Sequence, residues 1–167
     1  MGTKRVGWAR IKSLINENGN ELKTLYQQTV NCTVATTLTK AQSGALVYWT
    51  HSGAGHDITL PLAEVGMSFK FVIAAGHTAE HDIVCNTSDE FIGKVSVLST
   101  TANVTDTQLG NKTDNFKKIN LHATTTTLGG DIGDIIELNC FEANHWHVTA
   151  LLTLRTGIPA GTAVLTT

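Results

Sequence analysis

The chain has 167 residues, of which 41% are hydrophobic and 16% are charged, and its formal net charge at pH 7 is -2. This length and hydrophobic content suit one domain with a buried core, whereas the near-neutral charge argues against binding nucleic acid or membranes through overall electrostatic attraction. No apolar run approaches the length of a membrane span, and the N-terminus lacks the apolar core of a secretion signal, so we expect the protein to be made in the cytosol.

Residues 1–28 differ from the rest of the chain, because basic residues open this segment and an apolar repeat runs through it. The apolar side chains recur at spacings of 3, 4, 7 and 3, which is typical of a short helix with one apolar seam. The basic residues are Lys4, Arg5, Arg10 and Lys12, and the seam residues are Trp8, Ile11, Ile15, Leu22 and Leu25. A lone helix of this length is marginally stable in water, so we expect it to pack on its own β-domain, on sister subunits or on a partner.

The basic start of the chain has two interpretations. It is either a solvated terminus or an arm that docks on an acidic protein surface. Nucleic acid is a less favoured partner, because the rest of the chain offers no basic face interleaved with aromatic residues.

From Thr29 onward apolar residues alternate with polar ones, which is the pattern of half-buried β-strands. Residues 43–74 hold three predicted strands in quick succession, at 46–49, 58–60 and 67–73. The third strand carries Phe69 and Phe71 on one face, and this face needs a second layer to cover it.

The clearest hairpin is predicted at residues 134–153, where two alternating strands flank a turn at Glu142-Ala143-Asn144. Its apolar face includes Trp146 and Val148, and we expect this hairpin to be the second layer over residues 43–74. Residues 100–115 are polar and predict a long loop.

Together these patterns predict an all-β fold, an antiparallel β-sandwich or barrel-like domain with a short N-terminal helix. We divide the chain into an N-terminal arm and helix at 1–28, a β-domain at 29–155 and an extended, uncharged C-terminal tail at 156–167. The three cysteines, Cys32, Cys85 and Cys140, lie far apart among apolar residues, which predicts buried free thiols.

Histidines are the main candidates for chemistry in this sequence. His77, Glu80 and His81 match the His-x-x-Glu-His pattern of inverted zinc proteases, but that pattern needs a helix to place both histidines on one face. Gly76 and the strand-like residues on both sides predict a loop, so we expect no catalytic zinc.

His145 and His147 share one face of the second strand of the predicted hairpin. The histidines that could join them in a metal site are His51, His56, His77, His81 and His122. Alternatively, the pair meets around an oligomer axis or consists of ordinary exposed strand histidines. The sequence predicts no catalytic residue, no metal and no cofactor. Its aromatic residues, such as Trp49 and Trp146, belong either to the core or to a sugar-binding surface.

The order of pieces in the β-region resembles a group of small virion proteins from tailed bacteriophages. These share a Ser-Gly turn before a short aromatic strand, an Ile-Thr-Leu-Pro turn, a strand with alternating Phe, a His-Asp-Ile-Val-like strand and a closing hairpin with Asn-x-Trp-x-Val. The matching residues here are Ser43-Gly44, 47–49, Ile58 to Pro61, Gly66, Phe69, Phe71, 81–84, Gly133-Asp134 to Leu138, Asn144, Trp146 and Val148. Residues 6–11 are also similar to the start of some phage head-associated proteins.

The resemblance implies a capsid decoration (cement) protein that binds the outer surface of the assembled head as a homotrimer and stabilises it. The expected partners are the major capsid protein and further copies of this chain, with no nucleic acid and no membrane. The expected location is the capsid surface of the virion, after assembly in the host cytoplasm. The basic arm and the apolar seam within residues 4–25 are the expected contacts to capsid or sister subunits.

Two other functions remain as alternatives. One is a head-fibre or tail-fibre module that binds a host-surface glycan or receptor, although the chain lacks the long repetitive shaft of a tail fibre. The other is an enzyme, either zinc-dependent or a glycoside hydrolase. The resemblance argues against an enzyme, because the group shares no catalytic residues.

Overall fold

The computed structural model describes residues 27–99, 105–122, 128–154 and 164–167. These residues form twelve β-strands and one short 3-10 helix at Lys40–Gln42, which confirms the predicted all-β class. The predicted N-terminal helix falls in residues 1–26, outside the described residues. Within the described residues, no helix is long and apolar enough to cross a membrane.

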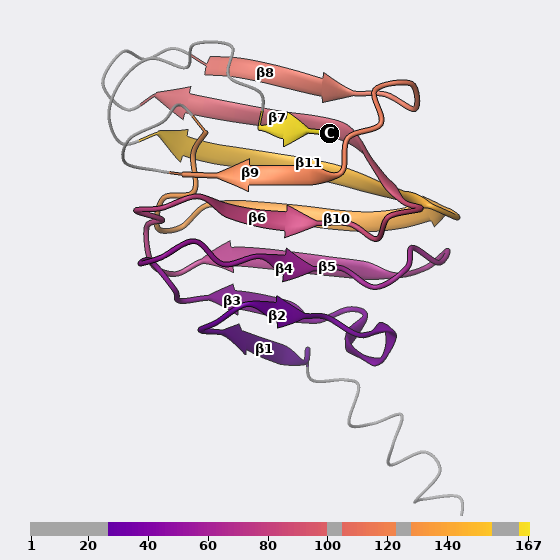
Figure 1. The fold of residues 1–167 in the computed structure, drawn as a ribbon, viewed down its shortest axis with the longest axis horizontal. Coiled ribbons are helices and arrows are strands. Elements are labelled where there is room, and N and C mark those ends of the chain that lie inside the picture. The colour runs from indigo at the N-terminus through magenta and orange to yellow at the C-terminus, as the bar shows by residue number, and fades with distance from the viewer. Residues whose placement is uncertain (1–26, 100–104, 123–127, 155–163) are drawn as a thin grey trace, which may run out of the picture.

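The strands form two sheets that lie face to face, with the shorter strands in front in Figure 1. The larger sheet runs in the order β1 (Thr29–Cys32), β3 (Leu46–Trp49), β5 (Ser68–Ile73), β10 (Ile135–Glu142), β11 (His145–Leu154), β7 (Glu90–Ser99) and β8 (Thr105–Gly110). The smaller sheet runs in the order β12 (Leu165–Thr166), β9 (Lys118–Leu121), β6 (His81–Val84), β4 (Ile58–Thr59) and β2 (Thr36–Thr37).

The antiparallel arrangement predicted from the sequence is wrong, because both sheets are mixed. Strands β1, β3 and β5 are parallel neighbours, as are β11 and β7 in the same sheet and β2, β4 and β6 in the other. The reason lies in the connections. From β1 to β7 the chain alternates between the two sheets, so each strand of one sheet is the crossover that parallel neighbours in the other require.

The predicted second layer is also corrected. Strand β10 pairs edge to edge with β5, so the β10–β11 hairpin extends the sheet that contains Phe69 and Phe71 instead of covering it. The cover comes from the smaller sheet, whose buried residues include Ile58, Ile83 and Ile119. Alternation of apolar residues identifies the buried face of a strand but does not say to which sheet the strand belongs.

Residues 100–115 are not one long loop, because residues 105–110 form the edge strand β8. Among the described strands, this one pairs only with β7, in the antiparallel direction, so its polar side chains fit an edge that faces water on one side. The amide of Gln108 crosses to the other sheet, where its Nε2 donates to the Leu165 carbonyl at 2.9 Å and its Oε1 accepts from the Leu165 amide at 2.8 Å. Gln108 thereby ties the two sheets together at this edge.

The core between the sheets follows the predicted alternation. Phe69, Phe71, Trp49 and Trp146 are fully or almost fully buried, and each large apolar side chain removed from water contributes about 1.5–3 kcal/mol to folding. The three cysteines are free and buried, as predicted. Burial raises the pKa of the Cys85 thiol to about 12, so this thiol stays protonated and unreactive at neutral pH.

Candidate functional site

The residues predicted to contact a capsid or sister subunits lie in residues 1–26, outside the described residues. They are Lys4, Arg5, Trp8, Arg10, Ile11, Lys12, Ile15, Leu22 and Leu25. In the described part of the chain, three other features are candidates for function. They are an apolar row on the larger sheet, a charged cluster at one end of the sandwich and a histidine cluster at the other.

The apolar row crosses the outer face of the larger sheet, on the side away from the core. Tyr48, Val72, Ile135 and Leu151 are successive cross-strand partners on β3, β5, β10 and β11. Tyr48, Ile135 and Leu151 are 42%, 40% and 61% exposed, and Val72 is half-buried. We call these four residues the outer row.

A shallow depression extends the outer row beyond the sheet. It has a volume of about 250 Å³, and Ile132, Ile135 and Leu151 contribute its apolar walls. The Ile132 side chain is 62% exposed. The row and the depression together form a continuous apolar surface that spans four strands and the turn before β10.

Asp134 lines this depression but has a structural role. Its Oδ2 accepts hydrogen bonds from the backbone amides of Gly130, Asp131 and Thr153 at 2.9, 2.9 and 2.8 Å. Burial raises the pKa of this carboxyl, while these three donors oppose the shift. The side chain therefore fixes the turn that presents Ile132 against β11.

Polar residues border the outer row on one side. In the neighbouring cross-strand row, the Lys70 ammonium lies 2.9 Å from the Glu137 carboxylate, and Thr149 follows on β11. An apolar centre beside a polar border is the usual composition of a protein–protein interface.

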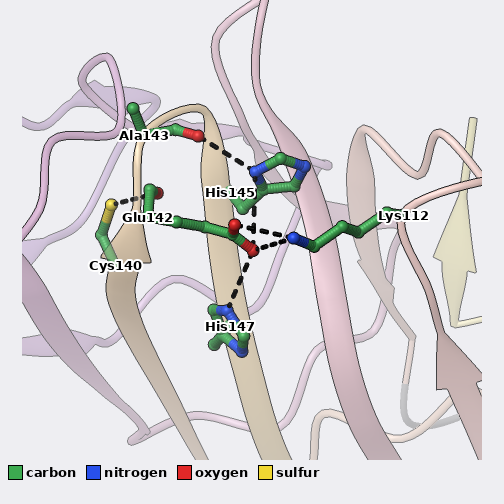
Figure 2. Close-up of polar contacts among 6 residues, drawn as sticks. All are labelled: Lys112, Cys140, Glu142, Ala143, His145 and His147. Atoms are coloured by element: carbon green, nitrogen blue, oxygen red, sulfur yellow. Dashed lines mark hydrogen bonds and ion pairs between the residues drawn. The ribbon is translucent and has the colours of Figure 1, made fainter.

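The charged cluster lies beside the turn of the β10–β11 hairpin. The Lys112 ammonium lies 2.7 Å from the Glu142 carboxylate, and Figure 2 shows His145 and His147 on either side of that carboxylate. The hydrogen bond from Lys112 lowers the pKa of Glu142. The ring nitrogens of His145 and His147 lie 3.9 and 3.8 Å from the carboxylate, which is too long for hydrogen bonds.

An aromatic side chain stands beside this cluster. Phe141 is 69% exposed, and its ring centroid lies 5.0 Å from that of His147 in an edge-on arrangement. An exposed aromatic ring next to charged groups is a surface on which polar ligands with an apolar face can stack.

The histidine cluster lies at the opposite end of the sandwich, where β3 and β5 end and β6 begins (Figure 1). His77 and His81 are fully buried, and their rings stack with centroids 4.1 Å apart. His51 Nδ1 lies 3.3 Å from His81 Nε2, and the His51 and His56 ring centroids lie 4.1 Å apart. Trp49 packs edge-on against both buried rings.

Burial decides the protonation of the two stacked histidines. It lowers the pKa of His77 to about 3, and the neighbouring His81, His51 and His122 add to the shift. Burial also lowers the pKa of His81, against the opposing effect of its hydrogen bond to the Ala79 carbonyl. Both rings are therefore neutral at pH 7, and neither ring nitrogen of His77 has a hydrogen-bond partner among the described residues.

The structure brings together His51, His56, His77 and His81 but leaves His145 and His147 at the other end of the sandwich, so a metal site that combines the two groups does not form. His77 precedes β6 in a loop and His81 begins β6, which confirms that the His-x-x-Glu-His residues form no helix. As the side chains stand, no three His, Cys, Asp or Glu residues among those described are arranged to hold a metal ion.

Comparisons with known proteins give no relative for this chain: no protein-family model, curated protein or solved structure matches it. Its function therefore has to be inferred from its own residues.

Sequence reasoning missed the outer row, because it followed only the inward-facing positions of each strand. The signal was present at Ile135 and Ile136, two adjacent apolar residues in a strand whose alternation should make one of them polar. Leu151 and Leu152 repeat this signal in the partner strand.

Proposed function

We propose that the chain is a capsid decoration (cement) protein of a tailed bacteriophage, which binds the outer surface of the assembled head as a homotrimer and stabilises it. The sequence resemblance supports this assignment, and its matched residues lie on or next to β3, β4, β5, β6, β10 and β11. They therefore include both sheets of the sandwich and are not confined to one local motif.

The observation that carries the proposal is the outer row. Tyr48, Ile135 and Leu151 expose apolar surface in one continuous line on the described part of the chain, next to Ile132 and its depression. Large exposed apolar patches on soluble proteins mark sites of protein association. We assign the outer row to contacts between sister subunits of the trimer.

The N-terminal segment supplies the proposed contact to the capsid. Its basic residues Lys4, Arg5, Arg10 and Lys12 suit an acidic capsid surface, and the seam from Trp8 to Leu25 packs on the major capsid protein or on sister subunits. A protein that binds only the assembled shell stabilises that shell by mass action. Three linked copies combine weak contacts into tight attachment through avidity.

A matched pair of variants tests the subunit contact. Leu151→Asp places a charge in the outer row, while Thr149→Asp places the same charge two residues away on the same exposed face of β11. Light scattering should give a trimer for the wild type and for Thr149→Asp, and a monomer for Leu151→Asp. A trimer of unchanged stability in Leu151→Asp would overturn the assignment of the outer row.

Deleting residues 2–26 tests the capsid contact. This deletion keeps Gln28, whose carbonyl accepts a hydrogen bond from the Leu46 amide beside β1. We expect the shortened protein to keep the β-sandwich but to lose cosedimentation with empty phage heads. Wild-type affinity for the heads after the deletion would contradict the role of the arm.

A fibre module that binds a host-surface glycan is the second candidate, and Phe141 favours it. Its 69% exposed ring lies beside His147 and the Lys112–Glu142 pair, which together offer a stacking face and polar groups to a sugar. A glycan array with the purified protein separates the two functions. Glycan binding that Phe141→Ala abolishes, together with no affinity for heads, would favour the fibre module over the decoration protein.

A further inference from the structure

We propose that His51, His56 and His81 form a binding site for a divalent first-row transition metal of the zinc class. Two of these histidines lie in the loop between β3 and β4, and the third is the first residue of β6. Neutral imidazole is a preferred ligand of zinc, copper and nickel ions. The inference is independent of the proposed capsid function.

The spacing of two ring nitrogens points to a shared ligand. His51 Nδ1 and His81 Nε2 lie 3.3 Å apart, and without an ion the two rings share a hydrogen bond at this distance. Two nitrogens bound to one tetrahedral zinc, each at about 2.0–2.1 Å, lie about 3.3 Å apart. The two rings therefore already stand at the separation of ligands to a single ion.

The tautomer of His81 suits this role. Its Nδ1 lies 2.8 Å from the Ala79 carbonyl, which can only accept a hydrogen bond, so Nδ1 carries the proton. The lone pair is then on Nε2, which faces His51. A backbone carbonyl that fixes the orientation and the tautomer of a ring is the usual support of a metal-bound histidine.

His56 completes the set after a rotation of its ring. The His56 ring centroid lies 4.1 Å from the His51 centroid and 6.4 Å from the His81 centroid. The centroids of His51 and His81 are 5.5 Å apart. Rings bound to one tetrahedral ion have centroids about 5 Å apart, so these separations bracket the required value. The His56 side chain is only half-buried, and the ring contacts that it makes among the described residues are edge-on contacts with His51 and His81, which an ion would replace with bonds to its nitrogen.

The loop that carries His51 and His56 is held against the start of β6. The Thr78 amide donates to the Ser52 carbonyl at 3.0 Å. A Cβ on Gly55 would lie 2.1 Å from the Glu80 carbonyl oxygen, so only glycine allows the loop to approach this closely. These contacts organise the ligands in advance and reduce the entropy that an ion must overcome on binding.

The histidine cluster is exposed to solvent on one side and buried on the other. His51 and His56 are half-buried and reach solvent, whereas His81 is fully buried with the neutral ring of His77 stacked behind it. The charged cluster at the other end lacks this arrangement, because the Lys112 ammonium already occupies the carboxylate between His145 and His147. That pair therefore provides the matched control.

The test uses the untagged full-length protein, stripped with EDTA and titrated with zinc sulfate by calorimetry. We expect one zinc ion per chain with micromolar affinity or tighter. His51→Ala and His56→Ala should each weaken binding by about tenfold or more, whereas His147→Ala should leave it unchanged. Failure of the wild type to bind zinc, or equal losses in His147→Ala, would overturn the proposal.

Two further measurements guard against misfolded variants. Zinc should raise the thermal unfolding temperature of the wild type and of His147→Ala, and should leave that of His56→Ala, whose altered side chain is half-exposed, nearly unchanged. Cobalt bound to the wild type should show the intense visible absorption of a tetrahedral site. The weak spectrum of the hydrated ion would contradict a site built from three imidazoles.

Discussion

The two faces of the β10–β11 hairpin differ in what their apolar residues do. On the inner face Ile136, Leu138 and Trp146 are fully buried between the sheets. On the outer face Ile135 and Leu151 are cross-strand partners that remain 40% and 61% exposed. The apolar residues on the inner face of this hairpin therefore stabilise the fold, whereas those on its outer face remain available for contact with another protein.

This difference shows how to separate stability from association in the chain. Substitutions on the inner face should change the free energy of unfolding, and substitutions on the outer row should change the solution mass.

Leu138→Ala should give the largest loss of stability. Leu138 is fully buried and pairs with Phe69 and Val148 on the neighbouring strands, so its truncation leaves a cavity and should cost about 2–5 kcal/mol. Urea unfolding measures this loss. The solution mass of the folded Leu138→Ala variant should equal that of the wild type. A folded variant that is monomeric would show that the inner face also affects association.

The buried histidines should make stability depend on pH. Burial holds the pKa of His77 at about 3 in the folded protein, against the ordinary histidine pKa of 6.5 in the unfolded chain. Below pH 6.5 His77 binds a proton in the unfolded chain but stays neutral in the folded protein. The free energy of unfolding therefore falls as the pH falls from 6.5 towards 3, and the contribution of His77 is present in full above pH 6.5. Between pH 7 and pH 5 the loss from His77 should be about 2 kcal/mol.

The control for this effect is His77→Leu, measured by urea unfolding at both pH values in EDTA. The variant removes the titrating ring, whose two nitrogens have no hydrogen-bond partner in the described part of the chain, so its unfolding free energy should change less between pH 7 and pH 5. His147→Leu, at the exposed cluster, should keep the pH dependence of the wild type. An equal pH dependence in wild type and His77→Leu would contradict the buried neutral state of His77.

Lys70→Ala should have the smallest effect on stability. The ion pair of Lys70 with Glu137 lies on the outer face, and both side chains are well exposed, at 40% and 48%. Water screens such pairs, so its loss should cost about 0.2–1 kcal/mol in urea unfolding and should shrink further in high salt. A loss as large as that of Leu138→Ala would mean that the outer face takes part in the core.

The sequence predicted the local structure better than the arrangement of the strands. Alternation at Phe69 and Phe71, and at Trp146 and Val148, correctly identified strands and their buried faces, because a period of two reports burial directly. The sheet to which a strand belongs depends on long-range pairing, which alternation does not encode. The edge strand β8 was missed because edge strands tolerate polar residues on both faces.

The candidate sites were harder to predict for a related reason. His51 and His81 are 30 residues apart in the sequence, and only the parallel order of β4 and β6 in the smaller sheet brings them together. The outer row likewise depends on the register of four strands, of which only β10 and β11 follow one another in the chain. The adjacent apolar residues at 135–136 and 151–152 mark single outward-facing positions, but no local pattern shows that these positions align across strands.

The solution mass of the full-length protein, with and without Leu151→Asp, tests the central claim most directly. We expect three times 17.9 kDa for the wild type and for Thr149→Asp, and 17.9 kDa for a folded Leu151→Asp variant. A wild-type protein that is monomeric at every concentration, or a Leu151→Asp variant that remains a trimer, would contradict the role assigned to the outer row.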